Sequence, residues 1–252
     1  MAIVTFWNND REQSGKTLTA VAVATKMAIE RNYKILLIST SFQDTTLRNC
    51  FWKNETQRTL KLFGMKSNNI AVETGIEGLA KLISANKLTP TTITDYTKVI
   101  FKGRLEVISG FMGAKELTRA TNYAEYEKIQ KIYVDLIKTA NQYYDMVLVD
   151  LDKYMPEDLT KEILKLSNLN VIVFSQRKES LDRYMMLREK EPIINSPKTL
   201  PVVGKYMDKT KYNMKNIMKY LGNRKDLSVI PLNMLYFEAS EEAAVPDLFL
   251  RL

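Results

Sequence analysis

Histidine is missing from this sequence and cysteine occurs only once, and both shortages narrow the chemistry that the chain can perform. Without histidine, a Ser-His-Asp triad, histidine zinc sites and histidine general bases are all excluded. The single cysteine, Cys50, cannot form an internal disulfide, which fits a reducing compartment. Any chemistry must therefore depend on Lys, Arg, Asp, Glu, Ser, Thr or Tyr.

A basic leader and long apolar runs are also missing. The N-terminus opens directly into an apolar segment, so we expect no signal peptide, and no apolar run approaches the roughly 20 residues of a membrane span. We expect a cytoplasmic protein. With 45% hydrophobic residues but only 9 glycines and 7 prolines, residues 1–252 are predicted to form a single globular domain rich in helix. The net charge of +8 leaves room for an anionic partner, whether DNA, RNA or an acidic membrane.

The segment from Asp10 to Thr17 reads as a phosphate-binding loop. It ends in Gly-Lys-Thr and lies between an apolar run at 2–7 and an Ala-rich helical segment at 18–31. Such a loop directs backbone N–H groups and the positive end of the helix dipole at one point, which suits polyphosphate oxygens. Lys16 would reach the β and γ phosphates, and Thr17 would bind Mg²⁺. Asp10 replaces the first glycine of the motif, so a chance Gly-Lys-Thr at an ordinary helix start is the alternative.

Strand-like and helix-like segments alternate along the rest of the chain. Helices are expected around 18–31, 45–51, 77–86, 123–143, 156–166, 179–190 and 212–221, and strands at 2–7, 34–39, 104–108, 145–150, 169–174, 202–206 and 227–231. This order predicts a three-layer α/β fold, in which helices cover both faces of a doubly wound, mostly parallel sheet. Ligands bind such folds at the carboxyl ends of the strands.

Asp150 closes the apolar run at 145–150, which has the form of a Walker B strand whose carboxylate holds Mg²⁺ through water. The alternative is a solvated residue at a strand end. We favour the metal site because the phosphate loop and Asp150 both follow strands of the predicted sheet, and so converge on one place.

The chain resembles the ParA/MinD-type ATPases with a deviant Walker A motif, a SIMIBI-like group of P-loop NTPases that includes the TadZ/CpaE-like branch. That family's loop, Lys-Gly-Gly-x-Gly-Lys-Thr, is similar to Arg-Glu-Gln-Ser-Gly-Lys-Thr at 11–17. Residues 144–150 are similar to its Walker B strand, 204–208 lie where it has its sixth strand, and 230–233 are similar to the segment that borders the adenine. The resemblance implies ATP and Mg²⁺ as cofactors, and a nucleotide site that includes Gln13, Ser14, Gly15, Lys16, Thr17, Thr19 and Pro231.

The resemblance also implies a homodimer that closes around the nucleotide. The family's signature lysine, which reaches the other subunit's phosphates, aligns with Arg11. We expect Arg11, Lys16 and Asp150 to carry any catalysis. An arginine offers a bidentate fork where lysine offers a point charge, so the contact would differ in geometry, and an exposed loop cation is the alternative for Arg11.

Other departures from the family concern hydrolysis. The second strand of the family usually ends in Asp-x-Asp, whereas this chain has Ser39 and Ser41 at those positions. Asp44 is the nearest acid and could substitute only if the loop bends back. Glu12 and Gln13 replace two loop glycines, and Asp152 adds a second acid near the metal. Nucleotide binding tolerates these changes better than hydrolysis, so we expect weak or absent ATPase activity.

A lysine stripe is predicted late in the chain. Lys211, Lys215 and Lys219 recur every fourth residue and would share one face of the helix expected at 212–221. Such a stripe can follow DNA phosphates without reading bases, although a solvated helix face is the more common explanation.

Three functions remain open on the sequence alone. The first is an ATP-binding, dimeric switch in DNA partitioning or in positioning a cellular machinery. The second is a degenerate scaffold of the same fold that binds partners without using ATP. The third is a metabolic enzyme related to the nitrogenase iron protein or dethiobiotin synthetase, and the single cysteine disfavours the iron–sulfur version.

Overall fold

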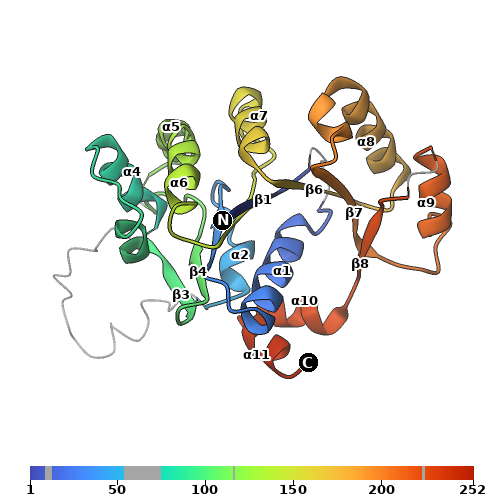
Figure 1. The fold of residues 1–252 in the computed structure, drawn as a ribbon, viewed down its shortest axis with the longest axis horizontal. Helices are drawn as coiled ribbons and strands as arrows, with labels where there is room; N and C mark the ends of the chain where they lie inside the picture. Colours follow the sequence, from blue (N-terminus) through green and yellow to red (C-terminus); the bar gives the residue numbers. More distant parts are fainter. Residues whose placement is uncertain (9–12, 54–74, 116, 223–224) are drawn as a thin grey trace.

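The fold is built on an eight-stranded sheet with the strand order β3-β4-β2-β5-β1-β6-β7-β8 (Figure 1). The structure is a computed structural model and describes residues 1–8, 13–53, 75–115, 117–222 and 225–252. Within these ranges the strands are β1 Ala2–Trp7, β2 Ile35–Ser39, β3 Lys98–Phe101, β4 Leu105–Ile108, β5 Met146–Asp150, β6 Leu169–Phe174, β7 Thr199–Tyr206 and β8 Ser228–Pro231.

The sheet is parallel except at one edge, which confirms the predicted fold class. Strands β3 and β4 pair antiparallel, whereas the other neighbouring strands of the described sheet are parallel. The antiparallel edge strand β3 was not predicted. Its short sequence, Lys-Val-Ile-Phe, is mostly exposed or half-buried and so lacks the apolar run that identifies a central strand.

Helices cover both faces of the sheet (Figure 1). On one face lie α4 Ile76–Ser84, α5 Arg119–Gln130, α6 Ile132–Ala140, α7 Glu157–Leu166, α8 Lys178–Lys190 and α9 Met214–Tyr220, and on the other lie α1 Lys16–Glu30, α2 Thr46–Asn49, α10 Met234–Glu241 and α11 Val245–Leu250. Two short 3-10 helices, Thr92–Tyr96 and Pro192–Asn195, complete the described elements.

Each face of the sheet has its own hydrophobic core, and strand β2 contributes to both. Leu36 and Ile38 pack into the core beneath α4 to α9, whereas Ile35 and Leu37 pack into the core beneath α1, α2, α10 and α11. All four side chains are fully buried. Successive strand residues point to opposite faces, so a strand that is covered on both sides must be apolar throughout. This is why the central strands are recognisable in the sequence.

Three expectations about helices need correction. The single helix expected at 123–143 is two helices, α5 and α6, which meet at Lys131; the buried positions keep helical spacing across that break, so periodicity alone does not reveal it. Helix α9 starts at Met214, because the Asn213 side chain caps it by accepting from the Asn216 N–H, so Lys211 precedes the helix. Helices α10 and α11 were not predicted.

The register brings three strand ends together. Ser39 at the end of β2 lies beside Asp150 at the end of β5, and Asp150 in turn lies beside Phe6 near the end of β1. The phosphate loop follows β1, so the sheet itself places the loop, Asp150 and the end of β2 side by side. Among the helices of the described residues, none has the length and apolarity needed to cross a membrane.

Candidate functional site

The end of the phosphate loop adopts the geometry expected of a helix start that binds an anion. Gly15 caps helix α1 with a left-handed φ of 83°, a conformation that glycine adopts without steric cost. The preceding residue, Ser14, is buried, and its hydroxyl accepts a hydrogen bond of 2.7 Å from the Asn8 side-chain amide. The loop is thus tied to the end of β1, with the N-terminus of α1 facing the carboxyl edge of the sheet.

Strand β7 packs against the same loop at Gly204. A Cβ atom on this residue would lie 2.1 Å from the Ser14 carbonyl oxygen and 2.9 Å from a methyl carbon of Val173. Because the first of these atoms belongs to the backbone, a side chain at this position would displace the loop. Glycine at 204 is therefore required for β7 to support the loop at this distance.

Lys16 and Thr17 both contact Asp150. The Lys16 ammonium lies 2.7 Å from Asp150 Oδ1 and donates a hydrogen bond of 2.5 Å to the Leu151 carbonyl, while the Thr17 hydroxyl donates to Asp150 Oδ2 at 2.9 Å. Asp150 is 2% exposed, so its charge is compensated mainly by Lys16. We name Ser14, Lys16, Thr17 and Asp150 together the loop wall.

The end of β2 faces the loop wall with hydroxyl groups. Ser39 donates to the Ser41 hydroxyl at 2.9 Å and lies 3.4 Å from Asp150 Oδ2, and the Thr40 hydroxyl accepts from the Asp152 backbone N–H at 2.8 Å. We name Ser39, Thr40 and Ser41 the hydroxyl wall. All three are buried, and none carries a carboxylate.

Asp152 supports the hydroxyl wall from the loop after β5. Its carboxylate accepts hydrogen bonds from the backbone N–H groups of Phe42, at 3.1 Å, and Tyr154, at 2.9 Å. Burial raises the pKa of Asp152, and these two N–H groups together with the nearby Lys16 partly oppose that rise. Asp152, the second acid expected near the metal site, thus lines the cavity while its carboxylate accepts hydrogen bonds from backbone N–H groups.

Asp44 lines the cavity from the loop after β2. Gln43, directly before Asp44, has a left-handed φ of 51°. Asp44 is exposed, lines the cavity together with Asp150, and accepts hydrogen bonds from the Thr46 N–H at 2.8 Å and the Thr46 hydroxyl at 2.6 Å. Asp44 therefore lines the cavity, and its role there remains a prediction.

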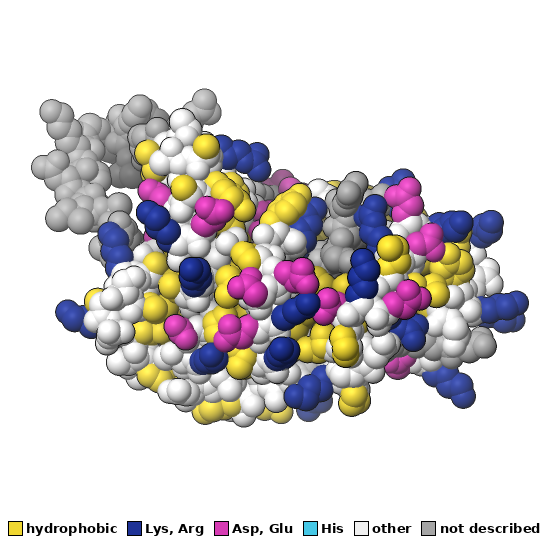
Figure 2. Space-filling model, turned by 90° about the horizontal axis from the view of Figure 1, so that it is seen from above, with side chains coloured by type: hydrophobic (Ala, Val, Ile, Leu, Met, Phe, Trp, Pro, Cys, Tyr) yellow, Lys and Arg dark blue, Asp and Glu magenta, His cyan; other side chains and the backbone are white. Residues whose placement is uncertain are grey.

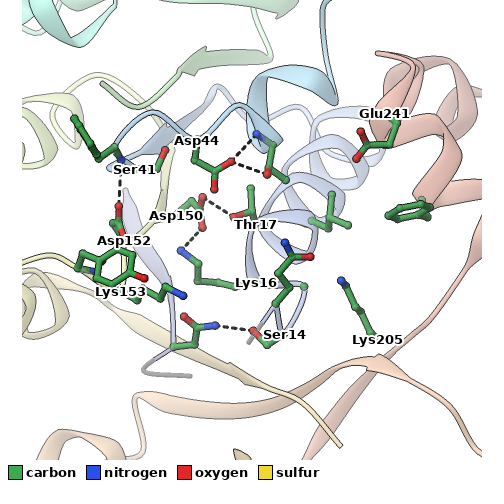
Figure 3. Close-up of a pocket in the computed structure, with 18 residues that line it drawn as sticks. Ser14, Lys16, Thr17, Ser41, Asp44, Asp150, Asp152, Lys153, Lys205 and Glu241 are labelled. Carbon is green, nitrogen blue, oxygen red and sulfur yellow. Dashed lines mark hydrogen bonds and ion pairs between the residues drawn. The ribbon is translucent and has the colours of Figure 1, made fainter. Parts of the chain in front are cut away.

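These walls enclose a cavity of about 290 Å³ (Figure 3). Its lining comes from the phosphate loop, the loop wall, Ser41 of the hydroxyl wall, the loops after β2 and β5, the start of α2, strand β7 and helix α10: Asn8, Gln13, Ser14, Gly15, Lys16, Thr17, Leu18, Ser41, Phe42, Asp44, Thr46, Asp150, Asp152, Lys153, Tyr154, Lys205, Phe237 and Glu241. Three lysines and four acids thus face one space, which suits a polyphosphate accompanied by a divalent cation.

A smaller hollow adjoins the cavity on the side of β8. Gly15, Thr19 and Pro231 line it, together with Leu18, Lys205, Ile230, Leu232, Asn233, Tyr236 and Phe237. Thr19 contributes little surface, because it is buried and its N–H donates to the Gly15 carbonyl at 2.8 Å. The residues predicted to bind the nucleotide are thus divided between two adjacent spaces.

Two predicted groups are not part of this cavity as described. Arg11 and its neighbour Glu12 lie outside the described residues. Lys211, Lys215 and Lys219 are exposed and do not line the cavity. Lysine and arginine side chains do extend from the end of the molecule where α9 lies, whereas both signs of charge are interspersed over the helices beside it (Figure 2).

Several residues that line the cavity were not predicted from the sequence. Asn8 was detectable as a polar residue directly after an apolar strand. Lys153 follows the Walker B strand closely and could also have been included. Lys205, Phe237 and Glu241 come from distant parts of the chain, and only the parallel pairing of β6, β7 and β8 brings them to the phosphate loop. No local pattern identifies them.

Comparison with solved structures finds similar folds over almost the whole chain. A ParA family ATPase from Chlorobium tepidum has a TM-score of 0.69 at 15% identity, covering 100% of this chain and 99% of that chain. The septum site-determining protein MinD from Pyrococcus horikoshii, complexed with Mg-ADP, has a TM-score of 0.67 at 13% identity, covering 98% and 88%. A putative plasmid partition protein from Borrelia burgdorferi, bound to AMPPNP, has 0.61 at 16%, covering 99% and 97%.

No protein-family model and no curated protein matches this chain. At 13% to 16% identity, the similarity to the three solved structures establishes the fold and not the activity. The chain has the fold of the ParA and MinD P-loop ATPases, as the resemblance in its motifs implied.

Proposed function

We propose that this protein binds ATP with Mg²⁺ and acts as a nucleotide-gated, dimeric switch in DNA partitioning or in positioning a cellular machinery. The observation that carries the proposal is the arrangement of the loop wall. Lys16 and Thr17, at the N-terminus of α1, lie 2.7 Å and 2.9 Å from the two carboxylate oxygens of Asp150. A cation, a hydroxyl and a carboxylate at one helix start are the groups that P-loop proteins use for phosphate and Mg²⁺.

The similar solved structures support a nucleotide as the ligand. The Pyrococcus MinD is complexed with Mg-ADP, and the Borrelia partition protein is bound to AMPPNP. In this chain, Thr17 and Asp150 would hold Mg²⁺, which supplies positive charge to the phosphates. Lys16 would exchange its contact with Asp150 for one with phosphate oxygens, since Asp150 then has the metal as its counter-charge.

Hydrolysis is proposed to be weak or absent because of the hydroxyl wall. A neutral serine hydroxyl is a poor general base, and Ser39 and Ser41 occupy the positions where the resemblance implies acids. Asp44 and Glu241 are exposed carboxylates that line the cavity, and Asp44 is the nearer of the two to the hydroxyl wall along the chain. Its carboxylate already accepts two hydrogen bonds from Thr46, which hold it at the start of α2.

Dimerisation would convert nucleotide binding into a switch. If Arg11 reaches the phosphates held by a second copy, the nucleotide binds the dimer more tightly than the monomer, and this difference in affinity drives association. Hydrolysis would then only reset the switch. A scaffold of the same fold that binds partners without ATP is the second candidate, and the hydroxyl wall is the observation that favours it.

The experiment is a calorimetric titration of ATP with Mg²⁺, with the same samples sized by light scattering. We expect binding and a shift to dimer in the wild type, and neither in Lys16→Ala, which removes the phosphate cation. Lys26→Ala is the matched control, because Lys26 is an exposed lysine on the same helix that pairs only with Glu30 among the described residues. Absence of binding in the wild type would favour the scaffold.

Nonspecific DNA binding by Lys211, Lys215 and Lys219 is a separate part of the proposal. The three side chains are exposed, and Lys215 and Lys219 lie one turn apart on α9. We expect Lys215→Glu with Lys219→Glu to abolish DNA retardation at low salt without changing ATP affinity. Lys98→Glu with Lys102→Glu, two exposed lysines near β3 at the opposite edge of the sheet, is the control. Equal retardation by both double variants would remove the DNA proposal.

A further inference from the structure

Lys205 has a backbone conformation that a lysine does not favour. It lies near the end of β7 with a left-handed φ of 51°, at the shift in register between Val203 and Tyr206 where β7 pairs with β8. This conformation brings Cβ close to the backbone and costs free energy that glycine would not. Residues held in this way are concentrated at functional sites, where the surrounding structure enforces them.

The side chain of Lys205 lies across the phosphate loop. Its Cγ, Cδ and Cε atoms are 3.2, 3.8 and 3.6 Å from the point where a Cβ on Gly15 would be. The missing side chain of Gly15 therefore makes room for the stem of Lys205. Together with the contact of Gly204 on Ser14, two successive residues of β7 pack directly on the loop.

The ammonium of Lys205 has no hydrogen bond or ion pair with the residues that the structure describes. It faces the cavity from the side of the loop opposite to Lys16 (Figure 3), and the residue lines both the main cavity and the smaller hollow beside β8. Lys16, by contrast, is engaged by Asp150 and Leu151. Lys205 is thus the cation on this side of the loop that is ready to receive an anion.

We propose that Lys205 is a second phosphate-binding cation, which contacts the phosphates of the bound nucleotide from the same chain. This inference rests on the proposed function. The aliphatic part of the Lys205 side chain covers Gly15, so its ammonium is held between the cavity and the smaller hollow. The phosphates of a nucleotide that occupies both spaces would lie at this point. A charge supplied in cis binds nucleotide before any dimer forms, unlike one supplied by Arg11 across an interface.

A purely structural role is the competing explanation, since the stem alone shields Gly15. Two variants separate the explanations. Lys205→Met keeps the apolar stem and removes the charge, so it preserves packing but loses the phosphate contact. Lys205→Gly removes both but relaxes the backbone, because glycine adopts a positive φ freely. Lys209→Met, an exposed lysine outside the cavity, is the matched control.

The test is calorimetry with ATP, ADP and adenosine, all with Mg²⁺, combined with thermal unfolding of each protein. We expect Lys205→Met to bind ATP about ten-fold more weakly than the wild type, as for a lost charged hydrogen bond, while its adenosine affinity and melting temperature stay unchanged. Lys205→Arg should keep most of the affinity. Lys205→Gly should lose ATP affinity while melting at the same or a higher temperature.

Each other result has a distinct meaning. If the wild type binds ATP, Lys16→Ala does not, and Lys205→Met binds as well as the wild type, the inference about Lys205 fails while the proposed function stands. Equal losses for ATP and adenosine would also overturn it, because they would indicate a contact with the base or ribose. A lower melting temperature for Lys205→Gly with unchanged affinity would establish the structural role instead. A wild type that binds no nucleotide would overturn both proposals.

Discussion

The loop wall and the hydroxyl wall lie side by side at the carboxyl edge of the sheet, where Ser39 pairs with Asp150, yet they present different chemistry. The loop wall pairs a lysine and a threonine with a buried carboxylate, and the backbone around it is fixed by Gly15 and Gly204. The hydroxyl wall consists of neutral side chains that bond to one another and to Asp152. Under the proposed function, the loop wall would bind phosphate and metal, whereas Ser39 and Ser41 would offer no carboxylate to activate water. The proposal therefore predicts that substitutions can separate nucleotide binding from hydrolysis.

Gly204→Ala should disrupt the loop wall most severely. The new methyl group would lie 2.1 Å from the Ser14 carbonyl oxygen, so either the loop or β7 must move. We expect ATP affinity to fall by roughly 100-fold and the melting temperature to fall by roughly 5–10 °C, the size of a severe steric substitution. Calorimetry and thermal unfolding measure both effects. Gly103→Ala is the control for strain away from the loop: a Cβ at Gly103 meets no atom within 4 Å, but its left-handed φ of 72° disfavours alanine, so only the melting temperature should fall and ATP affinity should stay unchanged. Normal ATP affinity in Gly204→Ala would show that β7 does not support the loop.

Thr17→Ala and Ser39→Ala compare the two walls directly. Both residues place a hydroxyl near Asp150 Oδ2, Thr17 at 2.9 Å from the loop wall and Ser39 at 3.4 Å from the hydroxyl wall. Only Thr17 is expected to bind the metal, so its loss should weaken Mg²⁺-dependent ATP binding by about 10-fold to 30-fold. Ser39→Ala should change the affinity less than about three-fold. ATP titrations of both variants with and without Mg²⁺ measure these losses of affinity. Similar losses in the two variants would contradict the claim that only Thr17 binds the metal.

Ser41→Asp should increase the rate of ATP hydrolysis, because it adds a carboxylate to the hydroxyl wall. Ser41 lines the cavity, so a carboxylate there can face a water molecule beside the phosphates. We expect phosphate release to rise by about five-fold with ATP affinity little changed. Ser39→Asp is the contrasting variant, since Ser39 is 1% exposed and a carboxylate there would face Asp150, so it should lower the melting temperature without activating hydrolysis. A Ser41→Asp protein with unchanged turnover would mean that hydrolysis is limited elsewhere.

The sequence predicted the central strands and the phosphate loop, but not the edge strand β3 or the two C-terminal helices. Buried parallel strands must be apolar on both faces, so β2 and β5 were recognisable, and the Gly-Lys-Thr at the start of α1 located the loop wall. The edge strand β3 and the short helices α10 and α11 lack such patterns.

Two features of the site depend on backbone geometry that no residue pattern encodes. Asp44 lines the cavity directly after Gln43, which has a left-handed conformation, and Lys205 lies on Gly15 where β7 shifts register beside β8. Helix α9 begins at Met214 instead of at 212 because Asn213 caps it, so Lys211 lies outside the helix face that Lys215 and Lys219 share. Periodicity predicts which elements form, whereas these placements follow from how the elements meet.

The separation of binding from hydrolysis can be tested in a single experiment on the wild-type protein. The protein is mixed with radiolabelled ATP and Mg²⁺, the complex is isolated by gel filtration, and the bound nucleotide is identified after increasing times. We predict that the complex retains nucleotide and that it remains ATP for many minutes. Rapid and complete conversion of the bound ATP to ADP would contradict the account of the hydroxyl wall, and an absence of bound nucleotide would contradict that of the loop wall.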